Sequence, residues 1–417
     1  MKSNKDKDVR SAKTENGQPE FHVERVNTKG KKVSSKHIKK EKKPWTFKRV
    51  MLRVVVPIVL VLTILVGGCY IGFLQYKKYL FSKMEFLPKI ENPTFINEDG
   101  SIVSLAQYAS ETENALVEEE HIHNFLLIGI DSRSRNLSDD GSGSLADVIM
   151  IMSLDDSQGT IKLVTVQRDS YAYFPGYKNP QKINAAMSYG GAEFLCSVIE
   201  NHLRLTLDGY AFVNFYHMEK VIDAVGGVDI DVSRNEAFTA EGGLNALLRE
   251  QNHILGEPDD KYLLTEAGYQ HLNGRQAVAY SRIRKVGDGD YGRSQRQIEV
   301  LNQLLYQFTH MNAAKQLTAI DDILEMVSTS LSPEEVENYA FDFLPKVKDL
   351  TLLTMQVPVQ GYYNEGIYSD FRQGEWSIRP DWNGMIPLVQ EFLFGETYPF
   401  DEVDPIPKAP NSTPKDS

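Results

Sequence analysis

Arginine residues are concentrated in one part of this 417-residue chain. Five of them fall within the 22 residues from Arg275 to Arg296, with apolar and aromatic residues interleaved. The planar guanidinium group binds phosphate or carboxylate oxygens in a bidentate way. The segment therefore predicts either a pocket for a multiply charged anion or a solvated helix face held by ion pairs.

The spacing of the last two arginines predicts a shared face. The apolar positions between residues 298 and 305 keep helical spacing, so we expect a helix that opens near Asp290. Arg293, Arg296 and Gln297 stand at positions i, i+3 and i+4 of that helix and therefore lie on one side of it. They are candidate ligands for the anion.

Other cations could join this group from elsewhere in the chain. Arg282 and Arg284 share a face if their segment is extended. Arg168 ends a predicted strand, and Lys182 begins a helix-like stretch, so both could add charge to the same pocket. The alternative is a local ion pair between Arg168 and Asp169, with Lys182 at the surface.

Two aspartates lie at the ends of neighbouring apolar runs. Asp131 follows the run 125–130, and Asp147 precedes the run 148–154. If these runs are antiparallel neighbours, the two carboxylates meet at one end of the sheet. Mg²⁺ is commonly held by one or two carboxylates together with phosphate oxygens and water. The alternative is that each aspartate only caps a turn.

Short apolar runs alternate with helical patterns along the chain, which predicts an α/β fold with a mixed central sheet flanked by helices. The expected strands are 125–130, 148–154, 161–166, 210–215, 228–232 and 350–357. The expected helices are 191–205, 218–224, 264–272, a stretch from about 290 to about 328, 333–344 and 385–394.

The N-terminal part has a different composition from the rest. Residues 1–50 hold 16 Lys and Arg against 6 Asp and Glu, although the whole chain has a net charge of −12. Residues 54–74 form an uncharged apolar run, long enough for one membrane-spanning helix. The excess of positive charge before this run predicts a cytoplasmic N-terminus and an extracellular C-terminal domain. This signal explains the lysines, so we expect no nucleic-acid partner.

These patterns divide the chain into six segments. They are a disordered basic cytoplasmic tail (1–50), a transmembrane helix (51–76), an extracellular connector (77–120), a domain core that holds the candidate site (121–310), a C-terminal part that completes the extracellular domain (311–400) and a disordered tail (401–417).

Several of these motifs, taken in order, resemble the LytR-CpsA-Psr family of Gram-positive bacteria. The resemblance covers about residues 121–310. The motifs are Gly129-x-Asp131-x-Arg133, Ala146-Asp147-Val148, Arg168-Asp169-Ser170-Tyr171, Lys182-Ile183-Asn184-Ala185-Ala186, Gly226-Gly227-Val228, the run from Leu272 to Arg284, and Asp290-x-Gly292-Arg293-x-x-Arg296-Gln297.

The resemblance implies a membrane-anchored, Mg²⁺-dependent phosphotransferase. Such an enzyme would move a teichoic acid-like or capsular glycopolymer from an undecaprenyl-pyrophosphate carrier onto peptidoglycan, with the prenyl chain in an apolar tunnel. By position, Asp131 and Asp147 would hold Mg²⁺, and Asp131, Asp147, Arg168 and Arg293 would be catalytic. The implied pyrophosphate ligands are Arg133, Arg168, Lys182, Arg282, Arg284, Arg293, Arg296 and Gln297.

One position departs from the family pattern. The family usually has an arginine two residues before the second aspartate, where this chain has Leu145. Arg133 or Arg135 could supply the missing cation from the intervening loop. Two other functions therefore stay open: a non-catalytic receptor for polyprenyl pyrophosphate, and a membrane-bound transcriptional attenuator of envelope genes.

Overall fold

The structure is a computed structural model that describes residues 71–72, 75–87, 89–90, 93–106, 116–130, 143–343, 352–368 and 375–400. The chain divides into two compact units, Met1–Ile71 and Gly72–Ser417, and the following description concerns the second. The predicted basic tail, nearly all of the predicted membrane helix and the C-terminal tail lie outside the described residues. Within the described ranges, no helix is both long and apolar enough to cross a membrane.

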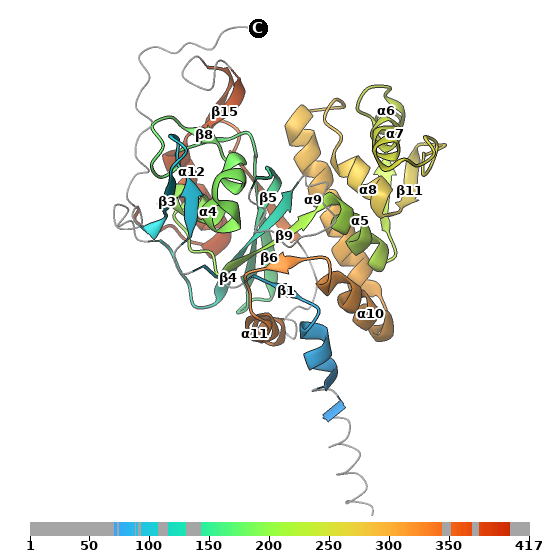
Figure 1. The fold of residues 1–417 in the computed structure, drawn as a ribbon, viewed down its shortest axis with the longest axis horizontal. Coiled ribbons are helices and arrows are strands. Elements are labelled where there is room, and N and C mark those ends of the chain that lie inside the picture. The colour runs from blue at the N-terminus through green and yellow to red at the C-terminus, as the bar shows by residue number, and fades with distance from the viewer. Residues whose placement is uncertain are drawn as a thin grey trace, which may run out of the picture. The chain divides into compact units, whose positions relative to one another are not determined.

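A seven-stranded mixed sheet forms the centre of the second unit (Figure 1). The strands β4, β5 and β6 are its longest members, and their apolar sequences are buried on both faces. In spatial order the strands are β1 (Glu85–Phe86), β12 (Ser328–Thr329), β9 (Gly209–Asn214), β4 (Ile122–Ile130), β5 (Ala146–Asp155), β6 (Thr160–Val166) and β13 (Leu352–Val357).

The pairing of β4 with β5 decides which polar residues can meet. The two strands are antiparallel neighbours, which is the arrangement expected to bring Asp131 and Asp147 to one end of the sheet. Ile130 pairs with Ala146 after a register shift at Gly129. Strand β9 is parallel to β4 on the other side. At the far edge, β13 runs parallel to β6, so the C-terminal part of the chain completes the sheet.

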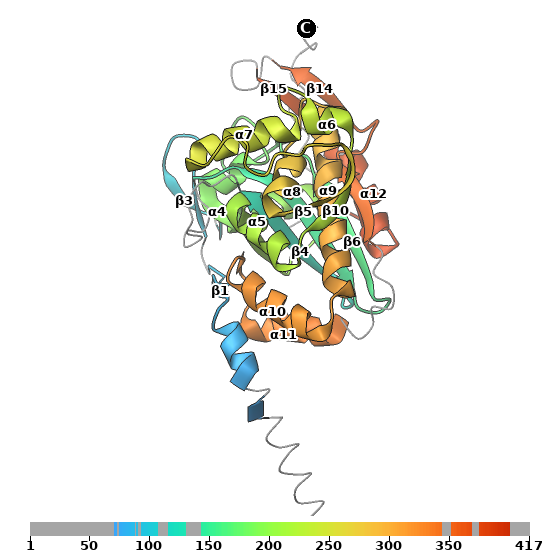
Figure 2. The same cartoon turned by 90° about the vertical axis from the view of Figure 1, so that its right-hand side faces the viewer.

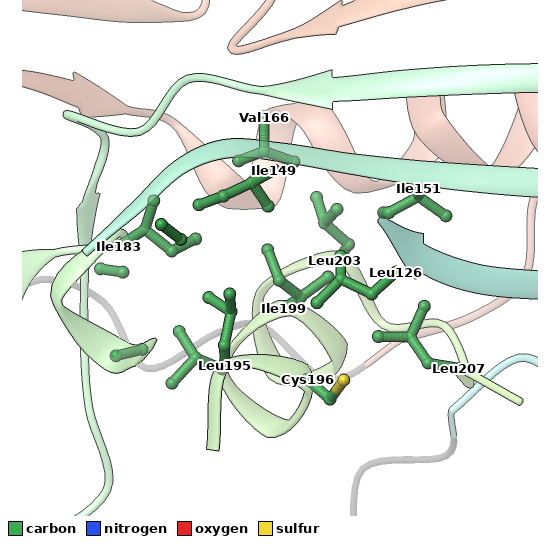
Figure 3. Close-up of a cluster of buried hydrophobic side chains, with 14 of the residues drawn as sticks. Leu126, Ile149, Ile151, Val166, Ile183, Leu195, Cys196, Ile199, Leu203 and Leu207 are labelled. Carbon is green, nitrogen blue, oxygen red and sulfur yellow. The ribbon is translucent and has the colours of Figure 1, made fainter. Parts of the chain in front are cut away.

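One face of the sheet is covered by α4 (Ala185–Leu203) and α12 (Trp382–Phe394). Leu126 and Ile149 from the sheet, with Leu195 and Ile199 from α4, are at most 1 % exposed and share one apolar core (Figure 3). Helix α4 bends at positions 190 and 191, so the helix expected from residue 191 is its second part.

The other face carries α5 (Phe215–Ala224), α8 (Gly274–Ser281) and α9 (Gly289–His310), seen face-on in Figure 2. Helix α8 begins where it does because Asn273 and Gln276 form a reciprocal capping box. It also packs very closely on α5. A Cβ added to Gly274 would lie 1.8 Å from the carbonyl oxygen of Glu219, which only glycine permits.

A small lobe projects from this second face, with a separate apolar core. It contains β10 (Val228–Val232), α6 (Arg234–Phe238), α7 (Leu244–Leu255) and β11 (Gly268–Leu272). The helix predicted over 264–272 is wrong, because residues 268–272 form β11 and pair antiparallel with β10. Gly268 has a φ of +109°, which a helix excludes, and β10 supplies the backbone partners.

The remaining elements are short, apart from two helices. Helices α10 (Ala313–Leu324) and α11 (Pro333–Phe343) occupy two of the regions expected to be helical. The sequence did not predict the three short strand pairs, which are β2 (Thr94–Ile96) with β3 (Ile102–Ser104), β7 (Tyr171–Ala172) with β8 (Gln181–Lys182), and β14 (Tyr363–Ile367) with β15 (Trp376–Pro380).

Candidate functional site

Charged side chains gather where β5 begins and β6 ends. Arg168, two residues after β6, forms an ion pair with Asp147 at the start of β5. Its Nε also lies 3.3 Å from the Asp169 carboxylate, and the other oxygen of that carboxylate is 2.8 Å from Lys182 Nζ. Asp169 therefore lies between two cations, and the predicted Arg168–Asp169 pair is present together with the other contacts.

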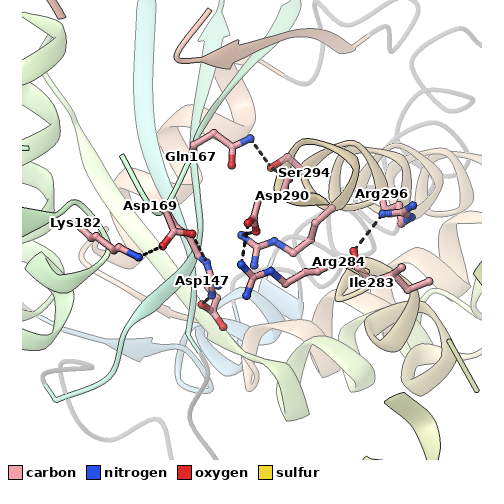
Figure 4. A network of polar contacts seen from close by, with 11 residues as sticks. Asp147, Gln167, Asp169, Lys182, Ile283, Arg284, Asp290, Ser294 and Arg296 are labelled. Carbon is pink, nitrogen blue, oxygen red and sulfur yellow. Dashed lines mark hydrogen bonds and ion pairs between the residues drawn. The ribbon is translucent and has the colours of Figure 1, made fainter. Parts of the chain in front are cut away.

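A second group of charges comes from the first turn of α9. Asp290 contacts two arginines, with one oxygen 2.8 Å from Arg284 and the other 2.9 Å from Arg293. A hydrogen bond of 3.3 Å from Gln167 to Ser294 ties this turn to the segment that carries Arg168. Figure 4 shows Asp147, Asp169 and Lys182 facing Arg284 and Asp290.

The electrostatics show that the two groups act on each other. Burial lowers the pKa of Arg293 to about 10, and the positive charges of Arg168 and Arg284 add to this effect. Burial alone would lower the pKa of Arg168, but Asp147, Asp169 and Asp290 together raise it. The charges near the ends of β5 and β6 and those of the first turn of α9 therefore lie close enough to shift one another's pKa values.

The balance of charge in this cluster is positive among the described residues. Four cations meet three carboxylates: Arg168, Lys182, Arg284 and Arg293 against Asp147, Asp169 and Asp290. An anion with several oxygens could replace some of these internal contacts and gain charge-assisted hydrogen bonds. We call these seven residues the cation cluster.

Two of the expected anion ligands make contacts outside the group of charges described so far. Arg296 points away from the cation cluster, with its Nε 2.7 Å from Glu236 and its terminal nitrogens on the carbonyl oxygens of Ile283 and Val286. The guanidinium of Arg282 lies 5.0 Å from the ring centre of Phe215. These contacts occupy Arg296 inside the protein and do not support a direct role in anion binding.

Arg282 and Arg284 do not lie on one extended segment, which was the condition for them to share a face. Helix α8 ends at Ser281, and Arg282 keeps a helical backbone as its C-cap. The chain then turns, which leaves the Arg284 side chain 46 % exposed and able to reach Asp290. The turn arises because β11, α8 and α9 fix both of its ends, which a local pattern does not reveal.

An apolar cavity of about 220 Å³ lies between the sheet and the helices α5, α8 and α9. Gln297 and Val148 both line it, so it reaches the helix that carries Arg293 and the strand that carries Asp147. Most of its other lining residues are aliphatic or aromatic, among them Leu127, Met150, Phe212, Met218, Val300 and Leu304. An amphiphile with a charged head and an apolar tail would suit this combination.

Of the two predicted Mg²⁺ ligands, Asp131 and Asp147, the structure describes only Asp147. Asp131 and Arg133 lie outside the described residues, but Asp131 follows Ile130, which pairs with Ala146 next to Asp147. A carboxylate is the donor type that Mg²⁺ prefers, so Asp147 fits a magnesium site that phosphate oxygens would complete. The described ranges contain no cluster of three or more His, Cys, Asp or Glu side chains placed to hold a metal.

Leu145 is 47 % exposed and precedes β5 directly. Among the described residues, Arg168 places a guanidinium group beside Asp147, while Arg133 and Arg135 lie outside these residues. Asp169 and Asp290 each join two cations, whereas the sequence predicts one partner for Asp169 and none for Asp290. The contact of Asp290 with Arg293 could have been predicted from the sequence, because an acid three residues before an arginine on a helix is placed to pair with it.

The fold and the site together define a class: an α/β protein with a cation cluster beside an apolar cavity. The LytR_cpsA_psr family model matches residues 97–376. The chain therefore belongs to the LytR_cpsA_psr family, which confirms the resemblance.

Curated relatives carry names that describe an activity. The chain is 31 % identical over 194 residues to the polyisoprenyl-teichoic acid–peptidoglycan teichoic acid transferase TagV of Bacillus subtilis, which covers 46 % of this chain and 45 % of that protein. It is 26 % identical over 299 residues to the transferase TagU of Bacillus anthracis, which covers 72 % of this chain and 84 % of that one. The match to TagV thus spans less than half of its length.

Solved structures support the fold. The protein gbs0355 from Streptococcus agalactiae has a TM-score of 0.53 at 18 % identity and covers 72 % of this chain and 94 % of its own. A structure described as TagT bound to LIIa-WTA has a TM-score of 0.50 at 22 % identity, with 67 % and 94 % covered. At these identities the likeness concerns the fold alone, and it confirms the mixed sheet flanked by helices.

Proposed function

We propose that this protein is a transferase that moves a glycopolymer from a polyprenyl-pyrophosphate carrier, such as undecaprenyl pyrophosphate, onto peptidoglycan through a phosphodiester. The names of the relatives TagU and TagV support this reaction class. The observation that carries the proposal is the cation cluster beside the apolar cavity. A lipid pyrophosphate has the charged head and the apolar tail that these two features match.

The reaction needs little from the protein beyond positioning and charge. A sugar hydroxyl of the acceptor attacks the phosphorus that bears the polymer, a new P–O bond forms, and the anhydride P–O bond breaks. Polyprenyl phosphate leaves with the electron pair, and the hydroxyl proton passes to a carboxylate of the site or to water. Arg168, Arg284 and Arg293 would neutralise the charge that develops on the phosphate oxygens.

Asp147 and Asp131 would hold Mg²⁺ in this proposal. The metal, when bound, supplies further positive charge to the pyrophosphate oxygens. Lys182 would bind the same anion from β8, and Gln297 would contact it where the helix α9 borders the cavity. Asp169 and Asp290 keep the cations from repelling one another before the substrate arrives.

The protein would act at the outer surface of the cell membrane. The uncharged run 54–74 would anchor it as a single-pass protein, with the basic N-terminus in the cytoplasm. The carrier lipid and the peptidoglycan acceptor would then both lie on the side of the C-terminal domain.

Turnover decides between this function and its alternatives. The full-length protein in detergent is mixed with a lipid-linked polymer donor, peptidoglycan fragments and magnesium. We expect polymer joined to peptidoglycan and release of polyprenyl phosphate. Binding of the donor without any joined product would contradict the transferase and leave a non-catalytic receptor, whereas neither binding nor product would favour the regulator.

A further inference from the structure

Arg296 is a buried arginine whose ion pair and hydrogen bonds go to residues outside the cation cluster. Its side chain is 8 % exposed and makes three separate contacts. The Nε pairs with Glu236 at 2.7 Å, while the terminal nitrogens donate to the carbonyl oxygens of Ile283 at 3.1 Å and Val286 at 2.9 Å. Bonds from a charged donor to buried acceptors are among the stronger ones in proteins.

The acceptor Glu236 is itself fixed by its surroundings. Its second carboxylate oxygen accepts bonds from the backbone and side chain of Ser233, at 3.0 and 2.6 Å, which closes the capping box of α6. Burial would raise the pKa of Glu236, but the bonds from Ser233 and the Arg296 side chain hold it below its usual range. The pair is therefore charged, and it joins α9 to the lobe that contains α6 and α7.

The two carbonyl groups that Arg296 holds lie on either side of Arg284. The segment 283–288 between α8 and α9 forms no helix or strand, and Gly287, just after the two held carbonyl groups, has a φ of +75°. The Arg284 side chain nevertheless has to reach Asp290, which also contacts Arg293. Without Arg296, the backbone on both sides of Arg284 would lose these two hydrogen bonds from α9.

We infer that Arg296, held by Glu236, is a positioning residue that sets the turn 283–286 and through it the place of Arg284 in the cation cluster. Arg296 acts on the substrate only through Arg284. The inference rests on the proposed function, because it assumes that the cation cluster binds a lipid pyrophosphate. It also gives the α6–α7 lobe a role, since the lobe supplies the carboxylate that orients Arg296.

The test compares Arg296→Gln with a matched control on the neighbouring helix α8. Arg275 is also a largely buried arginine that bridges two acids, but these are Glu219 of α5 and Glu257 just after α7 rather than groups of the turn. Arg275→Gln should therefore cost stability without altering the site. Both variants are made in the full-length protein, and binding of geranyl pyrophosphate in the presence of magnesium is measured by calorimetry beside thermal unfolding.

We expect Arg296→Gln to weaken geranyl pyrophosphate binding by about tenfold, the loss expected for roughly one charge-assisted contact. Arg275→Gln should keep the affinity of the unaltered protein, although both variants melt at lower temperature. Hydrogen exchange at the amides of 283–288 should quicken only in Arg296→Gln. Arg296→Lys should restore part of the affinity, because lysine can reach one of the three acceptors.

Glu236→Gln serves as a second variant if Arg296→Gln does not fold. It keeps the shape of the side chain and should weaken binding in the same direction by a smaller factor. Lower melting temperatures with unchanged affinity in Arg296→Gln and Glu236→Gln would overturn the positioning role. Failure of the unaltered protein to bind geranyl pyrophosphate would instead overturn the proposed function, and the positioning role with it.

Discussion

The two faces of the central sheet carry similar apolar side chains but differ in how tightly these side chains are packed. The face under α4 and α12 is closely packed, and its core side chains, such as Leu195 and Ile199, are completely buried. The face under α5, α8 and α9 leaves a cavity lined by equally apolar side chains. The first face holds the fold together, whereas the second keeps space free for a ligand.

Buried charges differ between the faces in the same way. On the packed face, burial raises the pKa of the partly buried Glu200 of α4 to about 7, although its carboxylate accepts a hydrogen bond from the backbone N–H of Leu207 at 2.9 Å. On the open side, Asp169 is similarly buried, but Lys182, Arg168 and Arg284 overcome the effect of burial and lower its pKa. A buried carboxylate without a cation in direct contact is a cost to the fold, while a network of opposite charges can serve binding.

The largest effect should follow from removing Arg293. Arg293→Ala should reduce transfer by about a hundredfold to a thousandfold, the usual loss when one group that stabilises a transition-state charge is removed. Asp290 keeps its bond to Arg284, so we expect the fold to survive. Turnover with a lipid-linked donor and a circular dichroism melt check both statements. Transfer at the level of the unaltered protein would remove Arg293 from the catalytic site.

Asp147→Asn tests the magnesium site next. We expect the Mg²⁺ concentration that gives half-maximal transfer to rise by at least about tenfold, since even groups that only support metal ligands have effects of this size. A chelator should stop transfer by the unaltered protein, and added Mg²⁺ should restore it. An unchanged magnesium requirement in Asp147→Asn would contradict the assignment of Asp147 as a ligand.

The same substitution on the two faces sharpens the contrast between them. Met187 on α4 is fully buried in the packed core, whereas Met218 on α5 lines the cavity. Met187→Trp should lower the free energy of unfolding by about 1 to 3 kcal/mol through overpacking, with donor affinity unchanged.

Met218→Trp should change stability little and fill the cavity instead. Affinity for a long-chain polyprenyl pyrophosphate should then fall more than affinity for geranyl pyrophosphate. Chemical denaturation and calorimetry on both variants give the comparison. Equal losses of stability in the two would show that the open face is packed as tightly as the other.

The smallest effect concerns the pH dependence of stability through Glu200. A carboxyl whose pKa is raised in the folded state favours folding below its unfolded value, and this contribution is lost as the pH rises from about 4.5 through about 7. Glu200→Gln should therefore be more stable than the unaltered protein at pH 8, by about 1 to 2 kcal/mol. The difference should vanish near pH 4, as thermal unfolding at both pH values would show. A constant difference across this range would mean that Glu200 does not titrate there.

Much of the sheet could be predicted from local pattern. The runs 125–130, 148–154 and 161–166 became β4, β5 and β6 because a strand buried on both faces must be apolar throughout, and few other elements read that way. The stretch 264–272 failed because its last five residues pair with a strand more than 30 residues earlier. The spacing of residues within a short stretch cannot indicate a partner strand that is distant in the sequence.

For the site as well, the sequence predicts some features and the tertiary structure decides others. Sequence alone selected the ingredients: guanidinium groups for a polyvalent anion, aspartates at strand ends, and an apolar surround. Helical spacing also placed Arg293 and Arg296 on one helix, yet it could not tell that one enters the cation cluster and the other holds a turn. That choice depends on which acceptors stand opposite each side chain, and only the packing of α9 against the lobe and the sheet brings Asp290 to one arginine and Glu236 to the other.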